Sequence, residues 1–261
     1  MKSEPSLLRR AAVRLKERSL HTLDLAHEVL GLTGNAGAAS AAVFTLLGAD
    51  PRFKVDADGW WSLHGEALLP VEELEQLSYA VVDVETTGGA PSRGHRITEI
   101  AVVEIRDGVI GGDFHTLVNP GRSIPRRIAE LTGINDEMVA GAPFFEDVAE
   151  ELLARLDGRV FVAHNVSFDW SFVNSQLADS LGQVPEGPRL CTVRLARRLT
   201  TGLRRRDLDS VASHFGIPIH DRHRAHGDAL ATARVLLRLL DEARGHGVRD
   251  LPGLHRLISG G

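Results

Sequence analysis

Residues 81–88 read VVDVETTG and place two carboxylates, Asp83 and Glu85, inside an apolar run. Side chains alternate between the two faces of a strand, so Asp83 and Glu85 share one face and the neighbouring valines point to the other. Like charges on one face of a buried strand repel each other, and a multivalent cation relieves that repulsion. All-oxygen ligands favour Mg²⁺ or Mn²⁺ over Zn²⁺. The alternative interpretation is a strand end whose carboxylates reach solvent or cap a neighbouring helix.

The composition is typical of a soluble globular protein. The chain has 261 residues, of which 43% are hydrophobic and 25% charged, enough for one large domain or one domain with a small companion. No run approaches the roughly 18 to 20 apolar residues of a membrane helix, and the charged N-terminal stretch lacks the apolar core of a signal peptide. The single cysteine, Cys191, excludes an internal disulfide framework. We therefore expect a cytoplasmic protein without membrane contact.

Arginine is concentrated in one segment of the chain. The net charge is −5, yet residues 189–206 contain seven arginines and no acidic residue. This segment, with Arg204 and Arg205 near its end, is our candidate for phosphate contacts, which position a strand without reading its sequence. The alternative is a solvated helix face and loop. An aromatic content of 5% argues against a long base-stacking platform.

Residues 1–68 predict a small α+β domain of the winged helix-turn-helix type. Three helical patterns, at 6–19, 21–31 and 35–48, precede a strand, a DADG turn and a second strand at 52–63. Thr22 is expected as the N-cap of the second helix, with Gly31 beyond its end. Trp60 and Trp61 are adjacent on a strand, so we expect one in the core and one exposed.

The third helix of this domain is a poor candidate for reading DNA bases. No lysine or arginine occurs between Arg18 and Arg52, and Asn35 is the one base-reading residue type there. Basic residues do occur on the first helix and on the wing at Arg52 and Lys54, which leaves backbone contact with DNA open. We favour protein–protein docking or an intramolecular role, with a polymerase or a repair protein as the expected partner.

The second unit, residues 77–245, begins with the carboxylate strand. Two long strand-like runs follow, joined by a turn at Asp107-Gly108, and the rest alternates a short buried strand with helices. This order predicts an α/β fold with a mixed central sheet flanked by helices. We expect a linker near residues 65–77 and interpret residues 246–261 as a short tail or an extra turn.

A second polar motif is FVAHNVSFDW, residues 161–170. It predicts a buried strand that ends at His164-Asn165, followed by a helix with Asp169 in its first turn. An alternative is that Asp169 only stabilises the helix dipole and Asn165 only forms a turn or cap.

A third motif is HDRHRAHGDALATARV, residues 220–235. It predicts an amphipathic helix that begins at Asp228 and follows three histidines, His220, His223 and His226. A transition-metal site built from these histidines is one alternative, and a solvated histidine-rich loop is the other.

The three motifs, taken in chain order, resemble those of the DEDDh 3′–5′ exonuclease superfamily. They are D-x-E-T-T-G, H-N-x-x-x-D and H-x-x-x-x-D. This superfamily has a ribonuclease-H-like fold and includes the proofreading epsilon subunit of bacterial replicative polymerase. The resemblance covers residues 77–242, and VNPGRSIPRRIAELTGINDEMVAGAPFFEDV between the motifs is similar to the family's linker. The family pattern usually has an apolar residue where this chain has His226.

The resemblance implies a site for two Mg²⁺ (or Mn²⁺) ions and a catalytic histidine. Its metal ligands would be Asp83, Glu85, Asp169 and Asp228. His223, five residues before Asp228, would be the general base, since imidazole accepts a proton near neutral pH. The further residues expected near the terminal nucleotide are Thr86, Thr87, Gly88, Asn165, Leu131 and Ile134.

The expected activity is removal of nucleotides from DNA 3′ ends as nucleoside 5′-monophosphates, in repair or proofreading. An exoribonuclease of the same superfamily is the alternative, because recognition of the 2′-hydroxyl depends on local geometry. From another class, a non-catalytic nucleic-acid-binding or scaffold protein is the rival, although all five catalytic positions are present.

Overall fold

The computed structural model of the chain describes residues 7–50, 52–63 and 73–259. The chain divides into two compact units, Met1–Val71 and Glu72–Gly261. The linker expected near residues 65–77 lies largely outside the described residues. Within the described ranges, no helix is both long and apolar enough to cross a bilayer.

The N-terminal unit contains the three helices and the hairpin expected, together with a short strand that the sequence did not indicate. Its elements are α1 (Leu7–Glu17), β1 (Leu20–His21), α2 (Thr22–Leu30), α3 (Ala36–Leu47), β2 (Phe53–Val55) and β3 (Trp60–Leu63). The three strands form an antiparallel sheet in the order β1-β3-β2. The assignment of this unit to the winged helix-turn-helix type stays a prediction.

Thr22 is not the N-cap of α2, as the sequence had indicated. His21 takes that position, and its Nδ1 accepts from the backbone N–H of Leu23. The hydroxyl of Thr22 instead donates to the carbonyl of Gly59 at 2.8 Å and accepts from the indole N–H of Trp61 at 3.0 Å. The Thr22 hydroxyl is therefore the hydrogen-bond partner of the buried Trp61 indole, and it does not cap α2. Trp61 is buried in the core of the unit, while the side chain of Trp60 is exposed, as expected.

A five-stranded mixed sheet forms the centre of the C-terminal unit. Its strands are β4 (Tyr79–Thr86), β5 (Ile97–Arg106), β6 (Val109–Leu117), β7 (Val160–Ala163) and β8 (Arg189–Cys191), in the order β6-β5-β4-β7-β8. The first three pair antiparallel, and β7 and β8 extend the sheet in parallel. This confirms the predicted α/β fold. The three-residue strand β8 was not predicted, because its Arg-Leu-Cys sequence carries no strand periodicity of its own.

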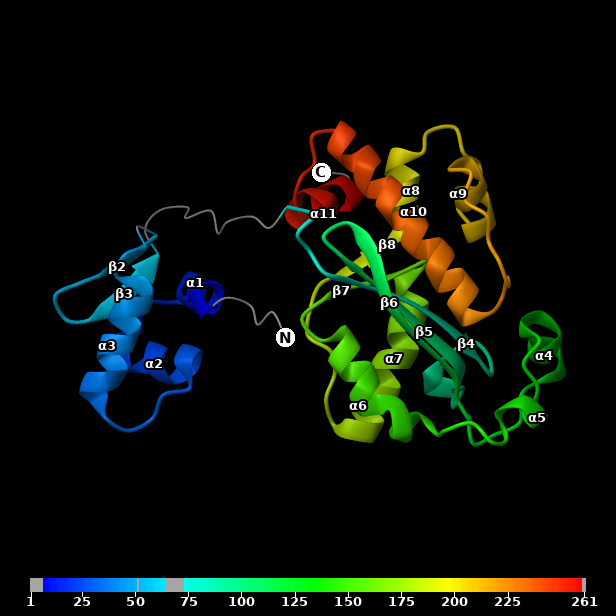
Figure 1. Cartoon of the computed structure of the whole chain (residues 1–261), viewed down its shortest axis with the longest axis horizontal. Coiled ribbons are helices and arrows are strands. Elements are labelled where there is room, and N and C mark those ends of the chain that lie inside the picture. The colour runs from blue at the N-terminus through cyan, green and yellow to red at the C-terminus, as the bar shows by residue number, and fades with distance from the viewer. Residues whose placement is uncertain (1–6, 51, 64–72, 260–261) are drawn as a thin grey trace. The chain divides into compact units, whose positions relative to one another are not determined.

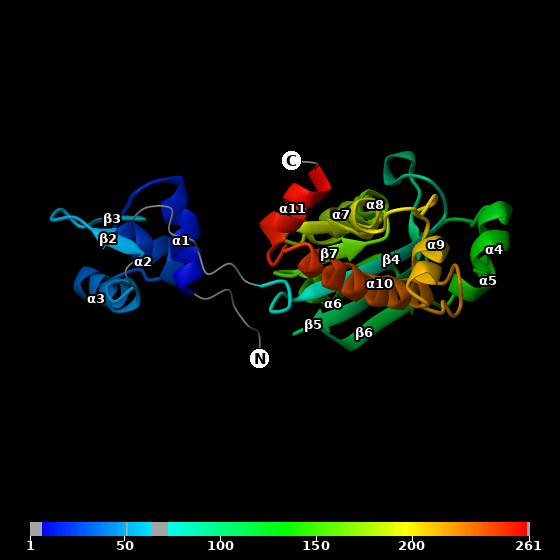
Figure 2. The ribbon, with the colours of Figure 1, turned by 90° about the horizontal axis from the view of Figure 1, so that it is seen from above.

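Helices cover both faces of this sheet (Figure 1). The helices of this unit are α4 (Arg126–Thr132), α5 (Asp136–Val139), α6 (Phe145–Leu156), α7 (Val166–Leu181), α8 (Thr192–Leu199), α9 (Leu208–His214), α10 (Ala225–Gly245) and α11 (Leu251–Ser259), with a short 3₁₀ turn at Pro91–Arg93. Apolar residues of α6 and α7 pack on one face, and those of α8 to α11 on the other. In both views α4 and α5 stand apart from the sheet (Figures 1 and 2).

Residues 246–261, interpreted from the sequence as a short tail or an extra turn, contain a full helix instead. Residues Leu251–Ser259 form α11, whose Leu254 is fully buried, and Asp250 forms a β-bridge with Glu73. Leucines at 251, 254 and 257 recur at helical spacing, and they pack into the same core as α10. The segment after α10 is therefore part of the domain.

Candidate active site

The central strand β4 extends beyond its parallel neighbour and carries two of the predicted carboxylates. Its pairing with β7 ends at Val81, two residues before Asp83. Alternation places Asp83 and Glu85 on the face of the sheet that α10 covers, because Val81 contributes to that core. The register against β5 shifts between Glu85 and Thr86. Such bulges occur next to active sites, where they redirect side chains.

Asp169, in the first turn of α7, reaches the open edge of β4. Its Oδ1 accepts a hydrogen bond of 3.2 Å from the backbone N–H of Val84, a donor that β7 is too short to pair. The side chain is only 4% exposed. Dipole stabilisation of α7 alone does not require this contact, so the structure brings Asp169 to the two carboxylates of β4.

Asp228 and His223 come from the start of α10 and the loop before it. Asp228 is buried, and its Oδ1 has no hydrogen-bond partner among the described residues. One donor atom each from Glu85, His223 and Asp228 lies within 4.8 Å of the others. His223 has φ of 64°, so the loop backbone turns sharply here to present the imidazole.

Burial raises the pKa values of the four acidic side chains, and the charges of neighbouring carboxylates add to the shifts. Burial raises the pKa of Glu85 to about 9, and the charges of Asp83 and Asp228 add to the shift. Burial also raises the pKa of Asp83 well above its usual range, with further contributions from Asp169 and Asp228. Burial likewise raises the pKa values of Asp169 and Asp228. Four carboxylates this close cannot all ionise without a compensating positive charge.

The donor set fits divalent cations with a preference for oxygen. It consists of carboxylate oxygens with one imidazole nearby, and the unpartnered Oδ1 of Asp228 is available as a ligand atom. A buried carboxylate oxygen without a hydrogen bond is costly unless an ion or water satisfies it. Asp83, Glu85, Asp169 and Asp228 are therefore the residues that would hold such ions.

Two arginines that the sequence did not single out belong to this site. Arg222 donates to Asp228 Oδ2 and to Asp209, and its guanidinium lies 3.3 Å from His223 Nδ1. Arg224 pairs through two nitrogens with Glu99, a residue only 3% exposed on β5. The sequence signal was the pair of arginines interleaved with histidines in HDRHR, which the interpretation as a histidine-rich loop passed over.

The TTG turn after β4 is held by its own side chains. Thr86 Oγ1 donates to the carbonyl of Gly88 at 2.6 Å, and Thr87 Oγ1 accepts from the backbone N–H of Arg96 at 3.1 Å. A Cβ on Gly88 would lie 2.3 Å from the His95 ring. A larger residue here would displace the His95 ring and would have to adopt a φ of 157°, so glycine is favoured at this position.

The other residues predicted near the substrate differ in accessibility. Asn165 is exposed in the left-handed conformation before α7, and Leu131 on α4 is exposed as well. Ile134 is fully buried with Ile124 and Val139. The prediction that Ile134 contacts bases is therefore wrong for this structure, because α4 and α5 need that side chain as their own small core.

The arginine segment 189–206 is divided between structural and exposed positions. Arg189 lies over the Trp170 ring, with its guanidinium 4.9 Å from the ring centroid. His164 Nε2 lies 2.8 Å from the backbone carbonyl of Arg206, which ties the loop to the end of β7. Arg204 and Arg205 are exposed, and Arg205 pairs with Asp207.

Two carboxylates on a central strand and two from helices beside it form a cluster suited to divalent ions, and two-metal sites occur in phosphatases, polymerases and nucleases. A family model described as Exonuclease (RNase_T) matches residues 80–236, more than half of the chain. The chain therefore belongs to this exonuclease family, whose members depend on divalent metal ions, and it is a 3′–5′ exonuclease.

Individual relatives agree with this assignment. DNA polymerase III subunit epsilon of Aquifex aeolicus is 35% identical over 184 residues, which cover 70% of this chain and 91% of the relative. The 3′-5′ exonuclease DinG of Bacillus subtilis is 39% identical over 69% of this chain, but this chain spans only 19% of that protein. The solved structure of Exonuclease X in complex with 5′ overhanging duplex DNA has 28% identity and a TM-score of 0.54, covering 70% of this chain and 99% of that one.

Proposed function

We propose that this chain hydrolyses DNA from its 3′ end to nucleoside 5′-monophosphates, in repair or proofreading. The observation that carries the proposal is the convergence of Asp83, Glu85, Asp169 and Asp228 from one strand and two helices, with His223 beside them. Two Mg²⁺ (or Mn²⁺) ions held there would stabilise the attacking and leaving oxygens of an in-line displacement.

His223 acts as the general base that takes the proton of the attacking water. Its donor atom lies within 4.8 Å of those of Glu85 and Asp228, so the base stands beside the metal ligands. A positioned general base contributes typically about 10² to 10⁴-fold to the rate. The Arg222 guanidinium lies 3.3 Å from Nδ1 of the imidazole. An N–H donated to Nδ1 would occupy the lone pair that the base needs, so the general-base step requires Arg222 to release this contact.

The substrate strand is positioned by groups around this centre. The backbone at Thr86, Thr87 and Gly88 faces the terminal nucleotide, and Asn165 and Leu131 supply accessible side chains. Arg204 and Arg205, both exposed, contact phosphates upstream.

The names of two relatives favour DNA over RNA as the substrate. The epsilon subunit is named for a DNA polymerase, and Exonuclease X was solved with duplex DNA. The N-terminal unit is proposed to dock on a polymerase or repair protein, because helix α3 carries no lysine or arginine for contact with DNA.

The test uses matched DNA and RNA oligonucleotides labelled at the 5′ end, single-stranded or 3′-recessed, with Mg²⁺ or Mn²⁺. The proposal expects a ladder that shortens from the 3′ end of DNA and disappears in Asp83→Ala. Asp179→Ala, which changes an exposed aspartate on α7, is the matched control and should keep full activity. Shortening of RNA alone would move the substrate to RNA, and shortening of neither would overturn the catalytic proposal.

A further inference from the structure

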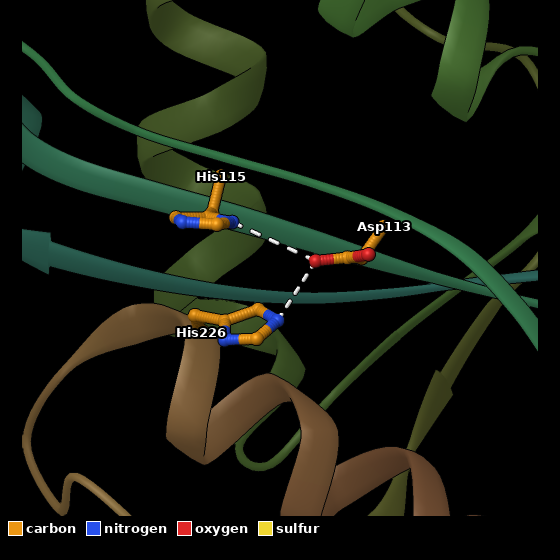
Figure 3. A group of neighbouring side chains, drawn as sticks. All are labelled: Asp113, His115 and His226. Carbon is orange, nitrogen blue, oxygen red and sulfur yellow. Dashed lines mark ion pairs between the residues drawn. The ribbon is translucent and has the colours of Figure 1, made fainter.

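A second group of metal-ligating side chains lies where β6 meets the first turn of α10. Asp113 and His115 come from β6, and His226 comes from α10. The Nε2 atom of His226 lies 2.8 Å from Asp113 Oδ2, and the Nδ1 atom of His115 lies 3.6 Å from the same oxygen. Figure 3 shows both imidazoles directed at that single carboxylate. The two rings stack with their centroids 4.5 Å apart.

We infer that Asp113, His115 and His226 form a binding site for Zn²⁺ or a similar transition metal, one that shares no ligand with the four-carboxylate site. Nitrogen and carboxylate donors in this combination suit Zn²⁺, which often takes three protein ligands and a water. Metal–ligand bonds of about 2.0 to 2.1 Å place the corners of a tetrahedron roughly 3.3 to 3.4 Å apart. The separations of 2.8 and 3.6 Å bracket that value, and all three donor atoms lie within 4.8 Å of one another.

The surroundings of the cluster leave room for a fourth ligand. The side chains of Asp113, His115 and His226 are 45%, 55% and 38% exposed, so water reaches the donors. Strand alternation places residues 113 and 115 on one face of β6, and the start of α10 brings the second imidazole to that face. Two separate elements therefore present ligands to one point without rearrangement of the backbone.

A metal at this site would fasten the start of α10 to the sheet. His226 stands three residues after His223 and two before Asp228, so the tie restrains the segment that carries both. The expected consequence is a higher melting temperature of the full chain with zinc, together with a more rigid loop before α10.

The test counts zinc bound to the full chain by elemental mass spectrometry after equilibrium dialysis, with saturating Mg²⁺ present to occupy the carboxylate site. We expect about one zinc per wild-type chain and an affinity lowered more than about 100-fold in His226→Leu, since even outer-shell partners cost 10 to 100-fold. Asp113→Asn, which leaves α10 intact, should give the same loss. His246→Leu, an exposed histidine after the same helix, should bind as the wild type does.

A spectroscopic variant identifies the ligand directly. In His226→Cys, bound Co²⁺ should show a sulfur-to-cobalt charge-transfer band that the wild type lacks. Equal zinc binding by the wild type and His226→Leu would overturn the inference, as would loss of the zinc in Asp83→Ala, which would place it in the carboxylate site. Neither readout requires nuclease activity, so failure of this inference is distinguishable from failure of the proposed function.

Discussion

Arg222 pairs with Oδ2 of Asp228, while Oδ1 of the same carboxylate is buried without a hydrogen-bond partner among the residues described. Burial raises the pKa of Asp228, and the charge of Arg222 opposes that shift. Arg222 therefore supplies positive charge to the acidic cluster from the protein itself. It competes with a metal ion for Asp228, since a carboxylate bound to a guanidinium is a weaker ligand.

Replacing Arg222 should make metal binding easier. In Arg222→Gln we expect the Mg²⁺ concentration that gives half-maximal activity to fall several-fold, because the competing cation is gone. The measurement is a Mg²⁺ titration of the initial rate of nucleotide release. Arg238→Gln, an exposed arginine on the same helix, is the control and should leave the midpoint unchanged. A higher midpoint in Arg222→Gln would show that Arg222 supports the metal ligands instead of competing with ions.

The pair formed by the buried Glu99 and the partly exposed Arg224 should position the start of α10. Glu99 accepts from the Arg224 guanidinium and, at 2.9 Å, from the backbone N–H of Ala225, so it anchors the turn beside Asp228. We expect Glu99→Gln to lower the free energy of unfolding by roughly 1–3 kcal/mol, since Arg224 keeps contact with solvent when it loses its partner. The maximal rate should also fall more than tenfold, while KM changes little.

Glu104→Gln is the matched control for that prediction. Glu104 is also buried on β5 but pairs with Arg106, Arg155 and Arg159. Its loss should reduce stability without reducing the rate of the folded enzyme. If both variants lose activity equally, Glu99 serves stability alone.

The metal-free protein should lose stability as the pH rises. Burial raises the pKa of Glu85 from 4.5 to about 9, so the folded state keeps a proton that the unfolded chain releases in this interval. Since the unfolded state then binds fewer protons, the free energy of unfolding falls between about pH 4.5 and 9. The melting temperature in EDTA should therefore decline across this range, and saturating Mg²⁺ should remove most of the decline. In Glu85→Gln the decline in EDTA should be smaller, and an unchanged slope there would contradict the assignment.

The salt dependence of DNA affinity distinguishes the arginines Arg204 and Arg205 from the basic residues Arg52 and Lys54 of the N-terminal unit. In the Asp83→Ala background, which prevents cleavage, Arg204→Gln/Arg205→Gln should reduce the slope of log affinity against log salt for single-stranded DNA by about 1.4, at about 0.7 per phosphate. Arg52→Gln/Lys54→Gln in the N-terminal unit should leave the slope unchanged, because the proposed role of that unit is docking on a protein. A reduced slope in the second variant would show that the N-terminal unit binds DNA.

The sequence by itself determined the features that depend on short-range geometry. Alternation along β4 placed Asp83 and Glu85 on one face, and the same rule separated the buried Trp61 from the exposed Trp60. The left-handed Gly31 ends α2 as expected. Each of these follows from the stereochemistry of a few consecutive residues, which is present in any fold that forms the element.

Only the tertiary structure decided the pairings between distant segments. Glu99 and Arg224 are 125 residues apart in the chain, and nothing local to either predicts their contact. Packing between distant segments also explains three other features. It brings His226 to β6, buries Ile134 and places α11 in the core. Strand order and helix placement are set by the burial of apolar surface across the whole domain, so a polar side chain acquires its partner from the element packed beside it.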